Sequence, residues 1–229
     1  RKAIEQHNEL SRIITEIGNF RKLDNPPITG YEFHVLNLVS FTCPKYLILP
    51  YLRETLTELK KRKPDPKPAF RARVAIVGSE IDDPQLTKLI EGCGALVVSD
   101  RYCFGFVPRR EQIEIKEGET AFDAICRHYL YWNQCARFMD GFKIDQRHAI
   151  AAQLVEDFKA DGIIYENMKF CEFWSYEKVL ASHVLQQEMG IPCCTIEKEY
   201  TLGSVGQLRT RFQAFVESLE IKKLGHKEV

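Results

Sequence analysis

Residues 161–171, D-G-I-I-Y-E-N-M-K-F-C, run an apolar strand directly into a short turn that ends in a cysteine. The apolar part, residues 162–165, combines β-branched and aromatic side chains, which is typical of a strand buried on both faces of a parallel sheet. In an open parallel α/β sheet, ligands bind in the crevice at the carboxyl ends of the strands. The sequence therefore predicts that the Cys171 thiol lies at a functional edge of a sheet.

Further apolar runs of the same kind alternate with helical patterns along the chain. We expect strands at residues 73–78, 95–99 and 191–196, and helices at residues 84–93, 120–132, 145–159, 176–189 and 206–220. Strands that alternate with helices predict an α/β fold with a small doubly wound, mostly parallel sheet of the flavodoxin-like or Rossmann-like type. The polar residues that follow these strands are then expected to meet at one rim.

The first 63 residues have a helical pattern instead, broken at Asn25-Pro26-Pro27. Pro64, Pro66 and Pro68 then form a stiff polar connector. We therefore expect a helical arm with its Pro-rich connector over residues 1–67 and an α/β domain over residues 68–229. The chain opens on a helical pattern without Met and without a capping residue, which indicates a piece of a longer protein.

Composition excludes several classes of function. Lys and Arg number 32 and balance 32 Asp and Glu, whereas a nucleic-acid binder usually carries a basic excess. The sequence has no run of 18 apolar residues and no signal-peptide pattern, so we expect a cytoplasmic protein that binds neither membranes nor nucleic acid. Eight cysteines without a C-x-x-C pair are expected to be thiols or metal ligands rather than disulfides.

Common cofactor motifs are missing as well. Gly78 is followed by Ser-Glu-Ile rather than by G-x-G-x-x-G, which disfavours NAD and FAD, and no P-loop is present, so any ATP must be used by another protein. The histidines are scattered and suggest no zinc site. A weaker signal is the glycine-rich helix start at residues 203–207, because free backbone N–H groups at a helix start favour anions.

The pattern around Cys171 leaves three interpretations open. A thiolate beside a helix amino terminus is stabilised and can act as a nucleophile. A sulfur in an aromatic, low-dielectric pocket is also suited to ligating an iron–sulfur cluster. The remaining interpretation is a half-buried free thiol without a chemical role, and spacing alone does not choose among them.

Residues spread over the whole chain carry a family resemblance. They are Asn8 and Arg12, Gly78, Gly92-x-Gly94-Ala95-x-Val97-Val98, Asp161-Gly162 with Lys169-Phe170-Cys171, Gly190-Ile191-Pro192, Glu197, and Gly206-Gln207-Leu208-Arg209-Thr210-Arg211 with Phe215 and Glu217. With these residues the chain resembles the carboxyl-terminal part of a subunit of the 2-hydroxyacyl-CoA (2-hydroxyglutaryl-CoA) dehydratase and benzoyl-CoA reductase family. The M-K-F-C turn and the G-Q-L-R-T-R helix together make the resemblance specific.

The resemblance implies a heterodimer of homologous subunits that hold [4Fe-4S] clusters through cysteines. Cys171 would be one ligand, and the further ligands would come from an amino-terminal domain that is absent from this chain. A separate ATP-hydrolysing iron–sulfur activator would inject one electron at a time. The acyl-CoA thioester would then become a ketyl-type radical that leads to loss of water or to reduction of an aromatic ring, a step that needs a metal cofactor.

Within this scheme, we expect Gln207 and Glu197 to take part in the chemistry. Lys169, Tyr200, Gly206 and again Gln207 are expected to bind the acyl-CoA substrate. The E-K-E-Y stretch at residues 197–200 and the E-F-W stretch at residues 172–174 favour the benzoyl-CoA reductase branch. The alternatives are an (R)-2-hydroxyacyl-CoA dehydratase subunit and, from another class, a non-catalytic flavodoxin-like binding module.

Overall fold

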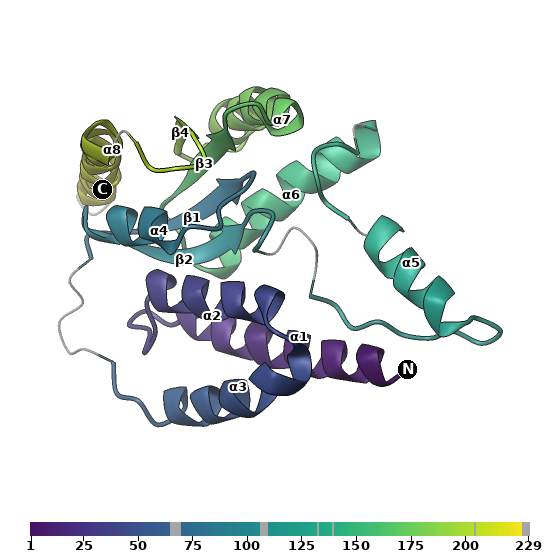
Figure 1. Cartoon of the computed structure of the whole chain (residues 1–229). Helices are drawn as coiled ribbons and strands as arrows, with labels where there is room; N and C mark the ends of the chain where they lie inside the picture. Colours follow the sequence, from purple (N-terminus) through teal and green to yellow (C-terminus); the bar gives the residue numbers. More distant parts are fainter. Residues whose placement is uncertain (65–69, 106–109, 132, 139, 204, 226–229) are drawn as a thin grey trace.

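The fold comes from a computed structural model that describes residues 1–64, 70–105, 110–131, 133–138, 140–203 and 205–225 (Figure 1). The strands are β1 (Ala72–Gly78), β2 (Ala95–Arg101), β3 (Gly162–Met168) and β4 (Cys193–Lys198). The helices are α1 (Lys2–Asn19), η1 (Phe20–Lys22), α2 (Gly30–Thr42), α3 (Lys45–Leu59), α4 (Pro84–Glu91), α5 (Ala121–Tyr131), α6 (Gly141–Asp157), α7 (Glu172–His183), η2 (Val184–Glu188) and α8 (Val205–Gly225).

The strands of the described residues form one parallel sheet in the order β2-β1-β3-β4. The chain runs from β1 to β2 on one side and then returns past β1 to β3 and β4 on the other. The direction in which successive strands are added across the sheet therefore reverses between β1 and β3, which is the topological switch point of a doubly wound fold. The predicted α/β fold class is confirmed.

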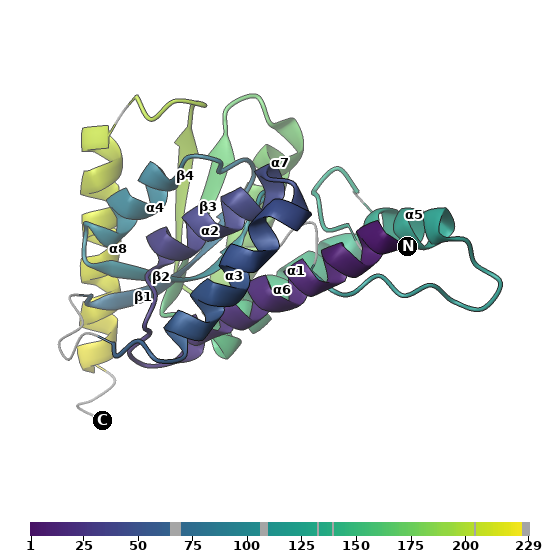
Figure 2. The same ribbon diagram turned by 60° about the horizontal axis from the view of Figure 1, so that its bottom comes forward.

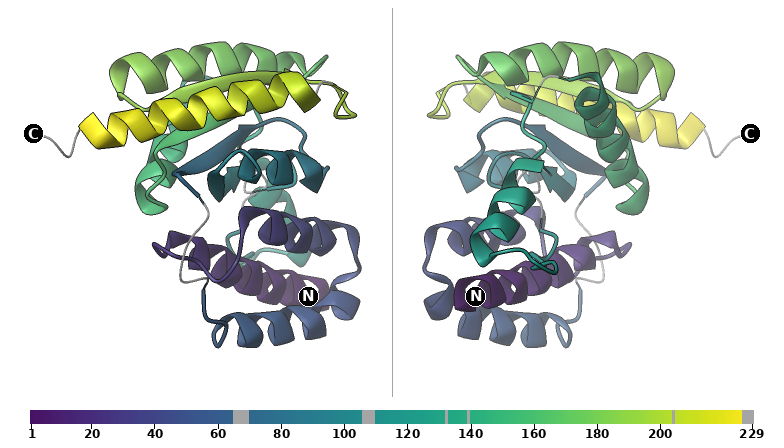
Figure 3. Two further views of the ribbon diagram at one scale, coloured as in Figure 1. Left: turned by 90° about the vertical axis from the view of Figure 1, so that its left-hand side faces the viewer. Right: turned by 90° about the vertical axis from the view of Figure 1, so that its right-hand side faces the viewer.

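Helices cover both faces of this sheet (Figures 2 and 3). Ile76 and Ile164 share one core with Leu86 of α4 and Phe212 of α8. The opposite face forms a second core, in which Val77 and Tyr165 meet α6, α7 and η2 through Ala151, Trp174 and Leu185. Since side chains alternate between the two faces of a strand, neighbouring strand residues enter different cores.

The helical arm has its own core and also contacts the sheet. Ile13 and Ile17 of α1 pack with Phe33 of α2 and Leu52 of α3. Helix α2 begins with a capping box, in which Thr29 and Glu32 each accept from the other's backbone N–H. Gly30 lets this helix approach β2 closely, because a Cβ there would lie 2.5 Å from Val97. The arm is therefore docked against the β2 edge, as Figure 1 shows.

Two buried arginines join the arm to the sheet. Arg21 Nη2 lies 2.5 Å from Asp100 Oδ1 at the end of β2, and both side chains are almost fully buried. Arg73 on β1 donates to the backbone carbonyls of Arg21, Leu23 and Phe158 at 2.6, 3.0 and 2.9 Å. These contacts fix the end of α1–η1 to the beginning of β1 and to the carboxyl terminus of α6.

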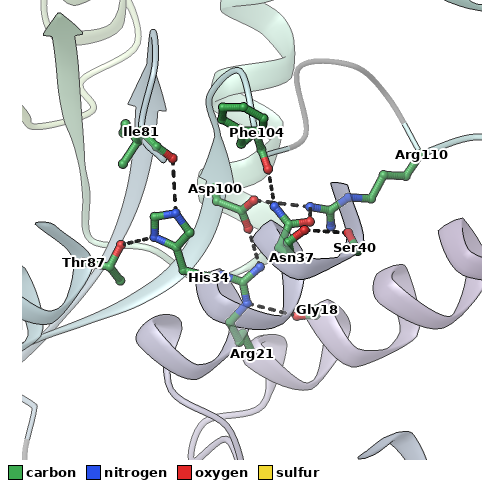
Figure 4. A network of polar contacts seen from close by, with 10 residues as sticks. All are labelled: Gly18, Arg21, His34, Asn37, Ser40, Ile81, Thr87, Asp100, Phe104 and Arg110. Atoms are coloured by element: carbon green, nitrogen blue, oxygen red, sulfur yellow. Dashed lines mark hydrogen bonds and ion pairs between the residues drawn. The ribbon is translucent and has the colours of Figure 1, made fainter. Parts of the chain in front are cut away.

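The polar network around Asp100 extends into α2 (Figure 4). His34 Nε2 lies 3.2 Å from the Ile81 carbonyl and its Nδ1 lies 2.9 Å from Thr87 Oγ1. Burial lowers the pKa of His34, so a neutral ring that donates to the carbonyl and accepts from the hydroxyl satisfies both contacts. Asn37 Nδ2 donates to the Phe104 carbonyl in the turn after β2. The arm therefore holds two of the loops that follow strands.

Several boundaries differ from those expected. Strands β2, β3 and β4 continue to Arg101, Met168 and Lys198, because parallel pairing persists as far as Met168 opposite Lys198. Helix α7 begins directly after Cys171, four residues earlier than predicted. The predicted domain boundary at residues 67–68 lies outside the described residues. Within the described chain, no helix is long and apolar enough to span a membrane.

The buried Arg21–Asp100 pair predicts a large loss of stability on replacement. Arg21→Met should lower the free energy of unfolding by about 3 kcal/mol or more, since removing one partner leaves a buried carboxylate poorly compensated. Arg53→Met breaks the partly exposed contact with Glu9 and should cost below about 1 kcal/mol. Urea unfolding followed by circular dichroism measures both. Equal losses in the two variants would contradict the assigned role of Arg21.

Candidate functional site

The rim of the sheet at the switch point is built on a close approach between β1 and β3. Gly78 pairs with Glu166, and a Cβ at Gly78 would lie 2.4 Å from the Glu166 carbonyl oxygen. Only glycine fits there. Ser79 then donates to Glu166 Oε2 from its backbone N–H at 3.0 Å and from its hydroxyl at 2.9 Å. The Ser79 hydroxyl oxygen also accepts from the Met168 N–H at 2.7 Å.

Glu166 is a buried carboxyl group opposite a buried lysine. Its Oε1 lies 3.9 Å from Lys198 Nζ, and neither atom has a hydrogen-bond partner among the described residues. Burial raises the pKa of Glu166 to about 7, and nearby Glu80 adds to the rise, whereas the Lys198 charge and the Ser79 donors oppose it. This carboxyl group therefore changes charge near neutral pH.

Cys171 lies on the turn after β3 and forms the N-cap of α7. Its N–H donates to the Met168 carbonyl at 3.1 Å, and its side chain is half-buried against the α6–α7 core. The preceding residue, Phe170, has a left-handed φ of 70° and is 98% exposed. A bulky residue rarely adopts this conformation without tertiary constraint. The turn is thus held in a strained shape that presents the cysteine at the rim.

Two further thiols lie near this turn. Cys103, just beyond β2, donates its N–H to the Ser79 carbonyl at 2.8 Å. Burial is the largest cause that raises the pKa of Cys103 to about 12, and nearby Glu80, Cys135 and Cys171 contribute to the same rise. Cys103 belongs to the residues after the second strand that were expected at the rim, whereas Cys135 was not assigned there, and neither was predicted as a cluster ligand. The position of Cys135 becomes apparent only when the α5–α6 segment is folded onto the sheet.

The thiols do not form a complete metal site by themselves. Among the residues that the structure describes, no group of three or more His, Cys, Asp or Glu side chains is arranged to hold a metal ion. Cys171 nevertheless offers a thiol, which is the donor that iron–sulfur clusters use. Cys171 therefore fits the donor type of such a cluster, and the described residues by themselves do not form a complete ligand set.

A cavity of about 270 Å³ opens at the same rim, between the end of β4 and the beginning of α8. Lys169, Glu197 and Gln207, all predicted site residues, line it together with Lys198 and Arg211. Lys169 is tied in place, because its N–H donates to the Lys198 carbonyl at 2.8 Å and its Nζ donates to Glu199 at 2.7 Å.

The other predicted site residues, two for the substrate and one for the metal, lie outside this lining. Tyr200 is exposed and its hydroxyl donates to Asp82 Oδ2 at 2.6 Å. Gly206 is exposed in the first turn of α8, and Ser204 before it lies outside the described residues. Cys171 packs on the α6–α7 face, away from the cavity lining. The structure thus gathers three of the predicted residues in one cavity, and the roles assigned to all six stay predictions.

Lys198 and Glu166 were expected at the rim, because both lie among the polar residues after predicted strands, but neither was predicted as a catalytic, substrate-binding or metal-binding residue. A signal was nevertheless present in the sequence. Glu166 directly follows one apolar strand pattern and Lys198 lies two residues beyond another, and charges are rarely buried unless they are paired. Two such residues on separate strands predict a buried pair once the strand order is known.

Comparison with known proteins supports a family assignment. The family described as 2-hydroxyglutaryl-CoA dehydratase, D-component, matches residues 1–219. The chain is 26% identical to the "Putative dehydratase subunit YjiM" of Escherichia coli (strain K12) over 227 residues, covering 96% of the chain and 57% of that protein. It is 25% identical to the "(R)-phenyllactyl-CoA dehydratase beta subunit" of Clostridium sporogenes over 218 residues, covering 95% of the chain and 56% of that protein.

The chain thus spans little more than half the length of either relative. The match nevertheless includes the helical arm, the sheet, the Cys171 turn and most of α8, so it covers the entire rim described above. This agrees with the resemblance inferred from the sequence. The chain belongs to the 2-hydroxyglutaryl-CoA dehydratase D-component family.

Proposed function

We propose that the chain is part of a 2-hydroxyacyl-CoA dehydratase subunit that removes water from a 2-hydroxyacyl-CoA thioester. The proposal rests on the α8 cavity, in which Lys169, Lys198 and Gln207 lie at the same rim as the Cys171 turn. The names of both relatives contain the word dehydratase. The benzoyl-CoA reductase branch favoured by residues 197–200 has no support from these names, so the dehydratase alternative is preferred.

The cavity suits the polar parts of an acyl-CoA. Lys198 is almost fully buried on its wall, and the amino-terminal end of α8 adds a positive partial charge. Lys169 is neutralised by Glu199, whereas Gln207 and Arg211 are exposed and add hydrogen-bond donors to the lining. Such donors stabilise a thioester oxygen or a phosphate, and they favour negative charge that develops during reaction.

We further propose that Cys171 is one ligand of a [4Fe-4S] cluster whose other ligands lie outside the described residues. When bound, the cluster would supply the low-potential electron that acid–base groups cannot provide. The chain itself contributes the turn that holds the thiol and the cavity that binds and orients the thioester. A homologous second subunit and an ATP-hydrolysing activator complete the proposed enzyme.

The cysteine assignment is tested by iron content. Cys171→Ala in the anaerobically purified subunit should lose much of its iron and visible absorption, because a cluster that loses a thiolate ligand becomes labile. Cys43→Ala, at an exposed thiol in the arm, is the matched control and should keep its iron. Iron that stays equal in both variants, and falls instead in Cys103→Ala or Cys135→Ala, would move the ligand to those thiols.

Two glutamines of α8 provide a matched test of whether acyl-CoA binds in the cavity. Gln207→Ala should weaken binding of (R)-phenyllactyl-CoA about 2- to 10-fold, as expected for one lost hydrogen bond. Gln213→Ala, exposed on the same helix and outside the cavity lining, should leave the affinity unchanged. Isothermal titration calorimetry measures both, while iron content stays at the parent level. Equal affinity in the two variants would remove Gln207 from the substrate site.

Substrate class separates the dehydratase, the reductase and the binding module. The assembled protein, with partner subunit and activator, should convert (R)-phenyllactyl-CoA to an unsaturated acyl-CoA when ATP and a reductant are supplied. It should leave benzoyl-CoA unchanged. Product analysis by mass spectrometry decides the outcome, since ring reduction would restore the reductase interpretation and conversion of neither ester would favour a non-catalytic module.

A further inference from the structure

The two oxygens of Glu166 have unequal surroundings. Oε2 accepts from both the N–H and the hydroxyl of Ser79, whereas Oε1 has no hydrogen-bond partner among the described residues. Lys198 Nζ, 3.9 Å from Oε1, likewise has no hydrogen-bond acceptor in the described part of the chain. Unmatched buried polar atoms are costly, so such a pair of atoms indicates a site for an additional group or proton.

Lys198 connects Glu166 to the α8 cavity. Its side chain is 3% exposed and lines the cavity wall, and Glu166 lies directly behind it with no exposed surface. Residues 164, 166, 196 and 198 alternate with those of the α6–α7 core, so Glu166 and Lys198 belong to the face covered by α4 and α8. An anion bound against this wall would therefore lie nearer to Lys198 than to Glu166, which is the competing negative charge.

Other charged and titratable groups near Lys198 and Glu166 also affect the net charge of the cavity wall. Glu80 follows β1, and burial raises its pKa, with a further rise from Asp82 and a lowering by Lys198. Cys103, whose pKa burial raises to about 12, remains a neutral thiol at physiological pH. Glu197, the neighbour of Lys198 in the lining, is paired loosely with Lys178 of α7 at 4.0 Å. Glu166 is thus the group beside Lys198 whose charge changes near neutral pH.

We propose that Glu166 takes up a proton on Oε1 when an anionic group of a ligand binds beside Lys198 in the α8 cavity. The inference deepens the proposed function by assigning a proton-coupled anion site to the acyl-CoA cavity. With Glu166 ionised, the lysine charge is already compensated. With Glu166 protonated, the cavity wall carries a net positive charge and the anion replaces the lost negative charge. The proton comes from the solvent and forms one O–H bond.

The sign of the pH dependence follows directly. An anion near Lys198 makes a second negative charge at Glu166 less favourable, so binding raises the pKa of Glu166 and draws in a proton. Affinity is highest below the pKa of free Glu166, which is about 7, and falls as the pH rises through that value. Ser79→Ala removes a donor to the ionised carboxyl group and should move this midpoint to higher pH.

Sulfate is the probe, because its charge stays constant across the relevant pH range. Calorimetric titration of the protein in buffers of different ionisation heat at pH 7 should show uptake of up to about half a proton per sulfate. Sulfate should bind about 5- to 10-fold more weakly at pH 8 than at pH 6, since one pKa unit of coupling corresponds to tenfold in affinity. Infrared difference spectra with ¹³C-labelled glutamate should show a protonated carboxyl band that appears with sulfate.

Single substitutions distinguish the role of Glu166 from that of Lys198. Glu166→Gln should keep sulfate binding but lose proton uptake, its pH dependence and the infrared band, whereas Lys198→Met should lose binding. Glu156→Gln, at an exposed position on α6, is the control and should behave as the parent protein. Sulfate that fails to bind the parent protein, or binds without proton uptake, overturns the inference. Proton uptake without turnover of any acyl-CoA would leave this site intact and overturn the proposed function alone.

Discussion

The contact between Gly78 and Glu166 is the constraint on which the rim depends. It sets the register of β1 against β3, and a side chain larger than hydrogen at residue 78 would push the two strands apart. Because the strands are parallel, this register decides which side chains stand at the same height along the sheet. This register positions Ser79 and Cys103 on one side of the contact. On the other side it positions the Cys171 turn and Lys198.

Sequence patterns were sufficient for the type of fold and for the position of the cysteine turn. The short apolar runs at β1 and β3, rich in β-branched residues, are typical of buried strands, and alternation with helices leaves few topologies. Strand ends were less predictable, because pairing across β3 and β4 extends the strands through Glu166 and Lys198, whose polarity suggests loops. Helix α7 also begins earlier than predicted. The left-handed turn at Phe170 leads directly into the helix, so that no loop separates Cys171 from its first residue.

The site was predictable only in part, because the Cys171 thiol and the α8 cavity lie on different faces of the sheet. Lys169, Glu197 and Gln207 follow from strand ends and a helix start, and they do line one cavity. Tyr200 is adjacent in sequence but turns to Asp82, a contact over 118 residues that no local pattern reveals. The grouping of Cys103 and Cys135 near Cys171 likewise depends on the path of the chain through α5 and α6.

The guanidinium of Arg73 has a consequence for the order of folding. Its carbonyl partners Arg21 and Phe158 lie 52 and 85 residues away in sequence. The full set of Arg73 hydrogen bonds can therefore form only after both distant segments have been brought together. Contacts of long sequence separation carry the greater loop-closure entropy and form late. The arm has a local core of its own and can collapse early onto β2 through Arg21 and Asp100, while the part of its attachment that runs through Arg73 waits for the end of α6 at Phe158. Arm, sheet and rim therefore become one cooperative unit only when the last third of the chain is in place.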